Sequence, residues 1–285
     1  MLYYYAHTGH KVGLERLRRG IALKHALQKH DIDMQMLVND FRAGVALKDE
    51  QGLSEYITIE TIQDIDAVAQ MGDSVIIDSD EDDHGRLVKY VADFKQVWRF
   101  AHDEADRSIH REVLLRVECK DEKCIEGMIV DDSYFKKRKK REAILFFLKD
   151  EDHEKAILKH KAFFQAFDME LLLGHYFFVK YEKDLSAIFN TLHEPETYME
   201  MITTCSTVVT ASSQAALEAK ASGAKVIFID MGGSPLYSIE VLEKSGILIL
   251  NGFDVSALQT LLESSVPETA ALIHRYDGNL LLQKI

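Results

Sequence analysis

The stretch Thr207-Val-Val-Thr-Ala-Ser-Ser-Gln-Ala-Ala-Leu-Glu218 decides how the second half of the chain folds. Its first four residues are β-branched and predict a strand. Small and hydroxyl residues follow, which allow a tight turn, and Ser212 or Ser213 can cap the next helix. That helix is expected over Ala215–Ser222 and ends at Gly223. A strand, a tight turn and a helix in this order are typical of a parallel α/β sheet.

The same alternation of short β-branched or aromatic runs with longer helical runs extends along the whole chain. The expected strands are Leu2–Ala6, Met34–Val38, Ser74–Asp78, Val97–Ala101, Ala143–Leu148, Tyr176–Tyr181, Thr207–Thr210, Lys225–Ile229 and Ile247–Leu250. The expected helices are Leu14–His30, Thr61–Gln70, His84–Lys95, Glu151–Phe167, Pro195–Thr204 and Ala215–Ser222. This pattern predicts an α/β fold with parallel sheets that helices cover on both faces.

The chain is long enough for two domains, and a basic run marks where they meet. At 285 residues it exceeds the usual size of one domain. The alternating pattern breaks at Lys136–Arg141 and then starts again, which predicts an N-terminal domain over 1–138 and a C-terminal domain over 139–285. The last helix either stays in the second domain or returns to the first. The basic run is interpreted as a solvated linker, with attraction of a diphosphate as the alternative.

Composition narrows the class of partner. The formal net charge is −13, which argues against nucleic acid as the main partner but leaves room for a local anion site. No run approaches the roughly 18 apolar residues that a membrane span needs, and the first residues do not form a secretion signal. The 3 cysteines lack metal-ligand spacing and favour a cytoplasmic location. Neither a cofactor nor a metal is implied, and the oligomeric state is left open.

The turn before the expected helix at Ala215–Ser222 has the chemistry of an anion site. Free N–H groups and the positive end of a helix favour a diphosphate. Glu218, two turns into the helix, can accept hydrogen bonds from both hydroxyls of a ribose, as an acidic residue does in dinucleotide folds. In the alternative interpretation, Ser212 and Ser213 only cap the helix and Glu218 is solvated. The spacing alone does not separate the two.

A family resemblance adds to this interpretation. The turn resembles the second-domain signature of GT-B nucleotide-sugar proteins, Ala-Gly-Gly-Ser-Thr-Thr-x-Glu. Ser212, Ser213, Gln214 and Ala215 stand at the Gly, Gly, Ser and Thr positions, and Glu218 stands at the ribose-binding Glu. The resemblance implies a nucleotide site formed by Ser212, Ser213, Gln214 and Glu218.

The chain is most similar to the UDP-sugar hydrolase family of pseudaminic acid biosynthesis, which is grouped with spore-coat-type predicted glycosyltransferases. Ile76–Asp80 resembles that family's strand ending in Asp-x-Tyr, and Met128–Phe135 resembles its Tyr-Ala-Leu-Leu-Arg-x-x-Phe. His102–Arg107 resembles its Asp-Asp-Leu-Ala-Asp-Arg, the most specific match. The resemblance implies two Rossmann-like domains facing a cleft, a catalytic or acceptor-side first domain, and a UDP-linked sugar as ligand. The expected activity is hydrolysis or glycosyl transfer in polysaccharide biosynthesis.

The sequence departs from the family pattern in its first loop. Of the family's Gly-x-Gly-His, only Gly13 is kept, with Glu15 at the second glycine and Arg16 at the catalytic His. Two unit charges about 4 Å apart near a protein surface interact by about 4 kcal/mol. A Glu15 that faces a diphosphate therefore opposes binding, unless Lys11, Arg16 or Arg18 neutralises it.

Further departures lie in the second domain and at the linker. Leu148–Glu151 replaces the family's Gly-Gly-Ser-Asp phosphate turn, Gly232–Pro235 replaces an Asn-Gln pair, and Asp132 replaces an Arg. These changes leave open a catalytically inactive family member that acts as a sugar-nucleotide-binding or protein-binding module.

Three residues are candidate replacements for the missing catalytic groups. His10 and His7 lie in the first loop, where a histidine near its ordinary pKa can act as a general base, with His10 ranked ahead of His7. Asp78 ends a parallel strand, at the edge where such sheets bind ligands. The alternatives are polar loop histidines and, for the acidic run 78–83, a solvated loop rather than a cation site.

Overall fold

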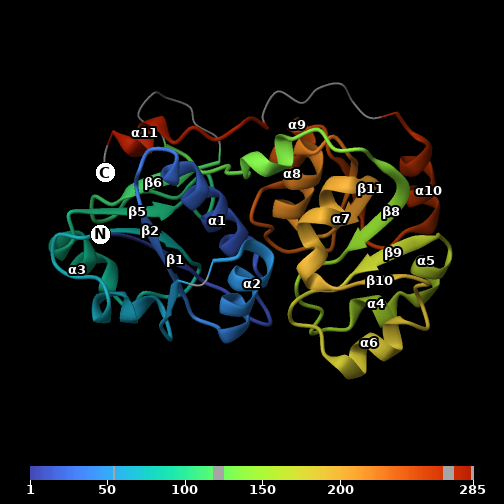
Figure 1. The fold of residues 1–285 in the computed structure, drawn as a ribbon, viewed down its shortest axis with the longest axis horizontal. Coiled ribbons are helices and arrows are strands. Elements are labelled where there is room, and N and C mark those ends of the chain that lie inside the picture. Colours follow the sequence, from blue (N-terminus) through green and yellow to red (C-terminus); the bar gives the residue numbers. More distant parts are fainter. Residues whose placement is uncertain (54, 118–124, 266–272, 284–285) are drawn as a thin grey trace. The chain divides into compact units, whose positions relative to one another are not determined.

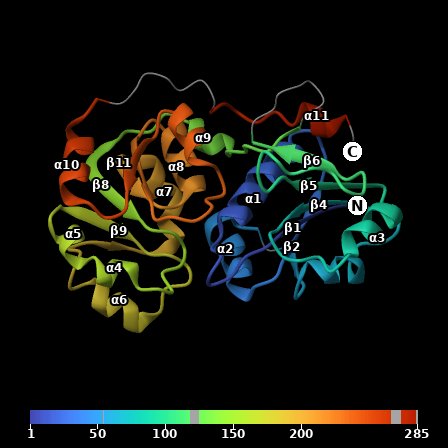
Figure 2. The same ribbon diagram turned by 180° about the vertical axis from the view of Figure 1, so that it is seen from behind.

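The computed structural model describes residues 1–53, 55–117, 125–265 and 273–283, and the chain divides into two compact units. The first unit contains Met1–Gly9, Arg16–Asp131 and Arg275–Ile285. The second contains Asp132–His274 together with the short segment His10–Glu15, which we call the Glu15 loop. Each unit is built on its own parallel sheet, as Figures 1 and 2 show from opposite sides. Over the described ranges, no helix is long and apolar enough to cross a membrane.

The first unit is built on a seven-stranded sheet with the strand order β3-β2-β1-β4-β5-β6-β7, in which every pair of neighbours is parallel. Its strands are β1 Leu2–Ala6, β2 Met34–Val38, β3 Tyr56–Thr58, β4 Ser74–Asp78, β5 Gln96–Phe100, β6 Val113–Arg116 and β7 Ile125–Glu126. The helices are α1 Glu15–Gln28, α2 Phe41–Gln51, the 3-10 helix η1 Ile62–Ala67, α3 Arg86–Asp93 and α11 Asn279–Leu282.

Alternate residues of β1 face two different layers of the first unit. Tyr3 and Tyr5 belong to an apolar cluster that includes residues of η1 and α3, whereas Tyr4 faces α1. A Cβ on Gly20 of α1 would lie 2.5 Å from the Tyr4 ring, so this glycine allows the helix to pack closely on the strand. Trp98 of β5 is fully buried. The sheet is therefore covered on both faces, as the alternating pattern predicts.

The second unit is built on a six-stranded parallel sheet with the order β10-β9-β8-β11-β12-β13. Its strands are β8 Arg141–Phe147, β9 Met169–Leu172, β10 Leu192–His193, β11 Cys205–Thr210, β12 Lys225–Asp230 and β13 Leu248–Asn251. Its helices are η2 Asp132–Phe135, α4 Ala156–Lys159, α5 Lys161–Gln165, α6 Val179–Leu185, η3 Pro195–Thr197, α7 Tyr198–Thr204, α8 Ser213–Ala221, α9 Ile239–Lys244 and α10 Val255–Glu263.

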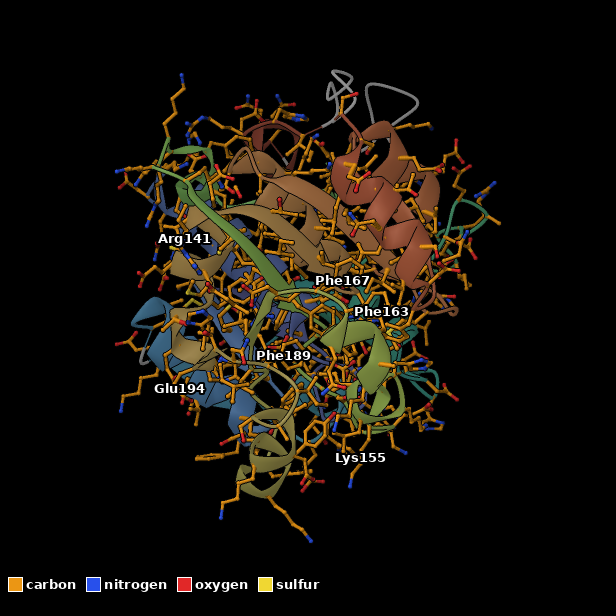
Figure 3. The ribbon with its side chains drawn as sticks, turned by 90° about the vertical axis from the view of Figure 1, so that its right-hand side faces the viewer. Arg141, Lys155, Phe163, Phe167, Phe189 and Glu194 are labelled. Atoms are coloured by element: carbon orange, nitrogen blue, oxygen red, sulfur yellow. The ribbon has the colours of Figure 1, made fainter. Side chains whose placement is uncertain are left out.

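Helices cover both faces of the second sheet. One face packs against α4, α5, α6 and α10 through an aromatic cluster, in which the ring of Phe164 lies 5.0 Å from Phe163 and 5.4 Å from Phe189. Figure 3 looks onto the side of the molecule where Phe163, Phe167 and Phe189 lie. The other face packs against α7 and α8, with the Tyr198 ring edge-on to Phe147. The predicted α/β class with two parallel-sheet units is confirmed.

Several expected elements differ from the structure where hydrophobic runs are short. The strand expected over Tyr176–Tyr181 is wrong, because Val179–Leu185 is the helix α6 and the sheet instead takes β9 and β10. The long helix expected over Glu151–Phe167 is interrupted at Lys155, which adopts a left-handed φ of 56° before α4. An aromatic run of this length fits a helix or a strand equally well, and packing decides between them.

Candidate functional site

The turn between β11 and α8 is held together by its own hydroxyl groups. The Ser212 Oγ accepts a hydrogen bond from the Ala215 N–H at 3.2 Å and so caps α8. The Thr210 Oγ1 accepts one from the Ser212 N–H at 3.0 Å. Both residues are buried, so the geometry of this helix start is fixed by side chains rather than by solvent.

Three donors at this turn converge on one carboxylate oxygen. The Ser212 Oγ, the Ser213 Oγ and the Gln214 N–H each donate to the Oε1 of Glu15, at 3.0, 3.0 and 2.9 Å. Anions favour this position, because the free N–H groups and the helix dipole are positive there. The three residues predicted to bind a nucleotide therefore all donate to one carboxylate oxygen of the Glu15 loop. The sequence predicted that Glu15 repels a ligand, and this contact was not anticipated.

Leu14 and Gly13 also hold the Glu15 loop against other residues of the second unit. The Leu14 N–H donates to the Asp150 Oδ2 at 3.3 Å, and the Leu14 side chain is fully buried. Gly13 has a φ of 81°, and a Cβ at this position would lie 2.7 Å from the Oε2 of Glu151. Only glycine combines this backbone conformation with so close an approach. Residues 13–15 thus lie against the end of β8 and the start of α8.

The carboxyl group of Glu151 is buried in an acidic environment. Its Oε2 has no hydrogen-bond partner among the described residues. Burial raises the pKa of Glu151 to about 8, and the negative charges of Asp150 and Glu15 act in the same direction, against Lys149. Glu151 is therefore mostly protonated at neutral pH, which removes part of the like-charge repulsion expected at this edge of the sheet.

Glu218 is buried and makes hydrogen bonds within the second unit. Its Oε2 accepts from the Tyr198 hydroxyl at 2.6 Å, and its Oε1 accepts from the Gln214 side-chain amide at 2.8 Å. The Tyr237 hydroxyl donates to the same amide's oxygen at 2.9 Å. The interpretation of Glu218 as a solvated helix residue is wrong, because only 1% of the residue is exposed.

In the first unit, Asp78 at the end of β4 is the centre of a buried ion pair. Arg19 of α1 donates to both of its oxygens, at 2.9 and 2.5 Å, and the Tyr4 hydroxyl donates at 2.5 Å. Arg16 lies 3.5 Å away, and the Arg19 guanidinium stacks on the Phe100 ring at 3.7 Å. Both oxygens of Asp78 are therefore committed to cations and a hydroxyl.

His7 follows β1 and lies beside a second carboxylate. Its Nδ1 is 2.5 Å from the Asp80 Oδ1, and the Arg16 Nη2 is 3.3 Å from the other oxygen of Asp80. The hydrogen bond to His7 and the positive charge of Arg16 hold the pKa of Asp80 well below its usual range, although burial opposes them. His10, by contrast, is exposed and belongs to the second unit. Within the described residues, no group of three or more His, Cys, Asp or Glu is arranged to hold a metal ion.

The stretch His102–Arg107 forms a turn after β5 and is hydrogen-bonded to Arg99 of that strand. The Arg99 guanidinium donates to both oxygens of Asp106, at 2.5 and 3.0 Å, and the His102 N–H donates to Asp106 at 2.9 Å. Burial alone would raise the pKa of Asp106, but these hydrogen bonds lower it to about 2. The stretch therefore has a structural explanation in the described contacts.

Neither a protein-family model nor a curated protein matches the sequence at a significant level. Solved structures do resemble the fold over its whole length. UDP-GlcNAc 2-epimerase from Methanocaldococcus jannaschii, in complex with UDP-GlcNAc and UDP, has a TM-score of 0.60 at 14% identity, covering 99% of each chain. UDP-GlcNAc 2-epimerase from Neisseria meningitidis, bound to UDP-GlcNAc, has a TM-score of 0.52 at 10% identity, covering 100% of this chain and 99% of that one.

A glycosyltransferase from Rickettsia africae is also similar, with a TM-score of 0.54 at 11% identity, covering 99% of this chain and 96% of that one. Identities this low show the fold alone. The fold is GT-B-like, with two Rossmann-like parallel-sheet units, and the expected fold class is confirmed.

Proposed function

We propose that this chain is a UDP-sugar-binding protein of GT-B fold whose second unit binds the nucleotide, with the diphosphate at the start of α8. The observation that carries the proposal is the convergence of Ser212, Ser213 and Gln214 donors on a single acidic oxygen. A phosphate oxygen is an anionic hydrogen-bond acceptor, like that carboxylate oxygen, and is bound by the same kinds of donor. The likeness in fold to proteins solved with UDP-GlcNAc and UDP supports the choice of ligand.

The ribose is assigned to Glu218, two turns along the same helix. Its two oxygens accept hydrogen bonds from Tyr198 and from Gln214. A carboxylate oxygen can accept more than one hydrogen bond, so a ribose hydroxyl can be a further donor to Glu218.

The reaction favoured by the sequence resemblance is hydrolysis or glycosyl transfer of a UDP-sugar in surface-glycan synthesis of the pseudaminic acid type, in the cytoplasm. Of the two candidate histidines, His7 is the better base, because Asp80 orients its ring. Asp78 then serves as a positioning residue, since Arg19 and Tyr4 occupy its oxygens.

A second candidate function is a non-catalytic sugar-nucleotide-binding or protein-binding module on the same scaffold. The observation that favours it is the contact of the Glu15 carboxylate with all three donors at the start of α8. A protein that turns over a nucleotide diphosphate has to empty this site in each cycle.

Calorimetric titration of the wild-type chain with uridine, UDP and UDP-GlcNAc tests the binding proposal. We expect uridine and UDP to bind, and Glu218→Gln to weaken uridine by about tenfold, or about 1.4 kcal/mol. The absence of binding for all three compounds at millimolar concentration would overturn the proposal.

Incubation with UDP-N-acetyl sugars then separates enzyme from binding module, with release of UDP and of free sugar measured by chromatography. If the chain is an enzyme, His7→Ala should lower turnover by about 100-fold or more, as expected for loss of a general base, while His10→Ala leaves it unchanged. Binding without product favours the non-catalytic module.

A further inference from the structure

Within the second unit, the Glu15 carboxylate contacts the start of α8 as a bound anion would. One of its oxygens, Oε1, accepts all three hydrogen bonds at the turn, two from serine hydroxyls and one from a backbone N–H. The donors belong to consecutive residues at the start of a nine-residue helix. They are separated from Glu15 by most of the chain, so the contact is a tertiary one and not a local cap.

The surroundings of this contact are acidic. Asp150 and Glu151 follow β8 on the same side, where Asp150 holds the Leu14 N–H and Glu151 lies under Gly13. The positive charge of Lys149 lowers the pKa of Glu151, whereas the negative charges of Asp150 and Glu15 raise it. A phosphate that entered with Glu15 still in place would meet the negative charge of Glu15 and find its three donors already in use.

We propose that Glu15 is an intramolecular substitute for the phosphate, which makes it the residue that determines ligand specificity at the start of α8. While Glu15 is bound, the site accepts a nucleoside but gains nothing from a diphosphate. A nucleoside diphosphate binds only as the Glu15 loop leaves. This inference rests on the proposed function for the identity of the nucleoside, but the competition between a carboxylate and phosphate for the three donors stands on the contacts alone.

Gly13 and the buried Leu14 hold the Glu15 carboxylate at the start of α8. Gly13 allows the chain to pass against Glu151, and Leu14 fixes the register of the loop through Asp150. The effective concentration of a tethered group of this kind is far above that of a free ligand.

The test is calorimetric titration of the full chain with three probes: uridine, UDP and inorganic pyrophosphate. The proteins are wild type, Glu15→Ala, Glu15→Gln and, as a matched control, Glu263→Ala, which removes an exposed glutamate of α10 in the same unit. Thermal unfolding of each variant shows that it is folded before it is titrated. Glu15→Gln keeps an oxygen acceptor of the same shape and removes the charge.

In wild type and Glu263→Ala we expect uridine and UDP to bind about equally and pyrophosphate not to bind. In Glu15→Ala, UDP should bind about tenfold tighter or more, which corresponds to about 1.4 kcal/mol, with uridine unchanged and pyrophosphate now detectable. Glu15→Gln should fall between the two. Should either Glu15 variant fail to fold, the other carries the comparison.

Two results would count against these ideas in separable ways. One result is that uridine binds, but neither UDP nor pyrophosphate binds more tightly to the Glu15 variants than to wild type. Glu15 then does not compete with phosphate, and only the proposed function survives. If pyrophosphate gains in Glu15→Ala while no protein binds uridine or UDP, the carboxylate is a phosphate substitute and the nucleotide assignment fails.

Discussion

The carboxylates at the strand ends of the two units are stabilised by different means. In the first unit, Asp78 and Asp80 are matched by arginine side chains, and Asp78 is held by Arg19 at 2.5 Å. In the second unit, the partly buried Glu15 and the buried Glu151 are accommodated in another way. Glu15 accepts hydroxyl and backbone hydrogen bonds, and Glu151 retains its proton because it is buried.

In our proposal, this difference distinguishes a carboxylate that fixes the structure from one that a ligand can replace. A buried aspartate paired with two arginines is costly to disturb, because either partner alone would be a buried charge. A carboxylate held by hydroxyl and N–H donors at a helix start can be replaced by another anion that uses the same donors. The first arrangement is suited to fixing a structure, and the second to accepting a ligand.

Removal of an arginine from the first unit should have the largest effect. Arg19→Met leaves Asp78 buried with less compensation, and we expect the free energy of unfolding to fall by about 3–5 kcal/mol, measured by urea denaturation. The control is Arg86→Met, because Arg86 pairs with Asp66 at an exposed position, with 43% of its side chain accessible, and such pairs contribute about 1 kcal/mol or less. If the free energy of unfolding falls equally in both variants, the buried Asp78 pair contributes no more to stability than an exposed ion pair.

The second prediction concerns the proton on Glu151. The folded chain keeps this proton up to about pH 8, whereas the unfolded chain loses it near the ordinary value of 4.5. The unfolded state therefore binds fewer protons between these values, so the free energy of unfolding decreases as pH rises through them. The contribution to this slope is at most about 1.4 kcal/mol per pH unit. Glu151→Gln should abolish it, as measured by urea denaturation from pH 5 to 8.

Glu263→Gln provides the control for the Glu151 variant, since this glutamate is exposed on α10 of the same unit. It should keep the wild-type dependence of stability on pH. If the stability of Glu151→Gln depends on pH as that of wild type does, Glu151 is ionised in the folded chain. Glu151 would then no longer be an example of a carboxyl group that is accommodated by keeping its proton.

Much of the fold could be predicted, because short, nearly continuous apolar runs such as β1, β4 and β12 can bury side chains on both faces only in a covered sheet. One further run of this kind was assigned wrongly. The run Tyr176–Tyr181 was expected as a strand, but the helix α6 starts within it at Val179, and side chains of α6 pack in the same apolar cluster as residues of β9. Prediction fails here because the deciding contacts come from residues far away in sequence.

The candidate site was predictable in its donors but not in its occupant. Ser212, Ser213 and Gln214 follow a strand and start a helix, which is a local pattern. Glu15 reaches them through a tertiary contact that no local spacing encodes. The sequence showed only an acidic residue close to a glycine in a loop. From its charge, that residue was predicted to repel an anionic ligand. The pairing of His7 with Asp80 was missed for the same reason.

The third prediction isolates the contact between the Glu15 loop and Glu151. Gly13 and Gly223 have nearly the same backbone conformation, with φ of 81° and 82°, but a Cβ on Gly223 would meet nothing within 4 Å. Gly223→Ala should therefore cost only the backbone strain, about 1–2 kcal/mol. Gly13→Ala adds a clash with the Glu151 side chain and should cost about 1–2 kcal/mol more in urea denaturation. Equal costs would show that the loop does not lie against Glu151.

The smallest expected effect tests whether the three donors act on Glu15 as a unit. Ser212→Ala removes both the cap of α8 and one donor to Glu15, and should cost about 1 kcal/mol. In a Glu15→Ala background only the cap is lost, so a double-mutant cycle should give a coupling free energy of about 0.5 kcal/mol or more. Ser238 caps α9 through the Val241 N–H at 3.3 Å and has no such contact, so its cycle with Glu15→Ala should give no coupling. Zero coupling for Ser212 would mean that the carboxylate is held by the helix start as a whole, and that the anion site is less specific than its three hydrogen bonds indicate.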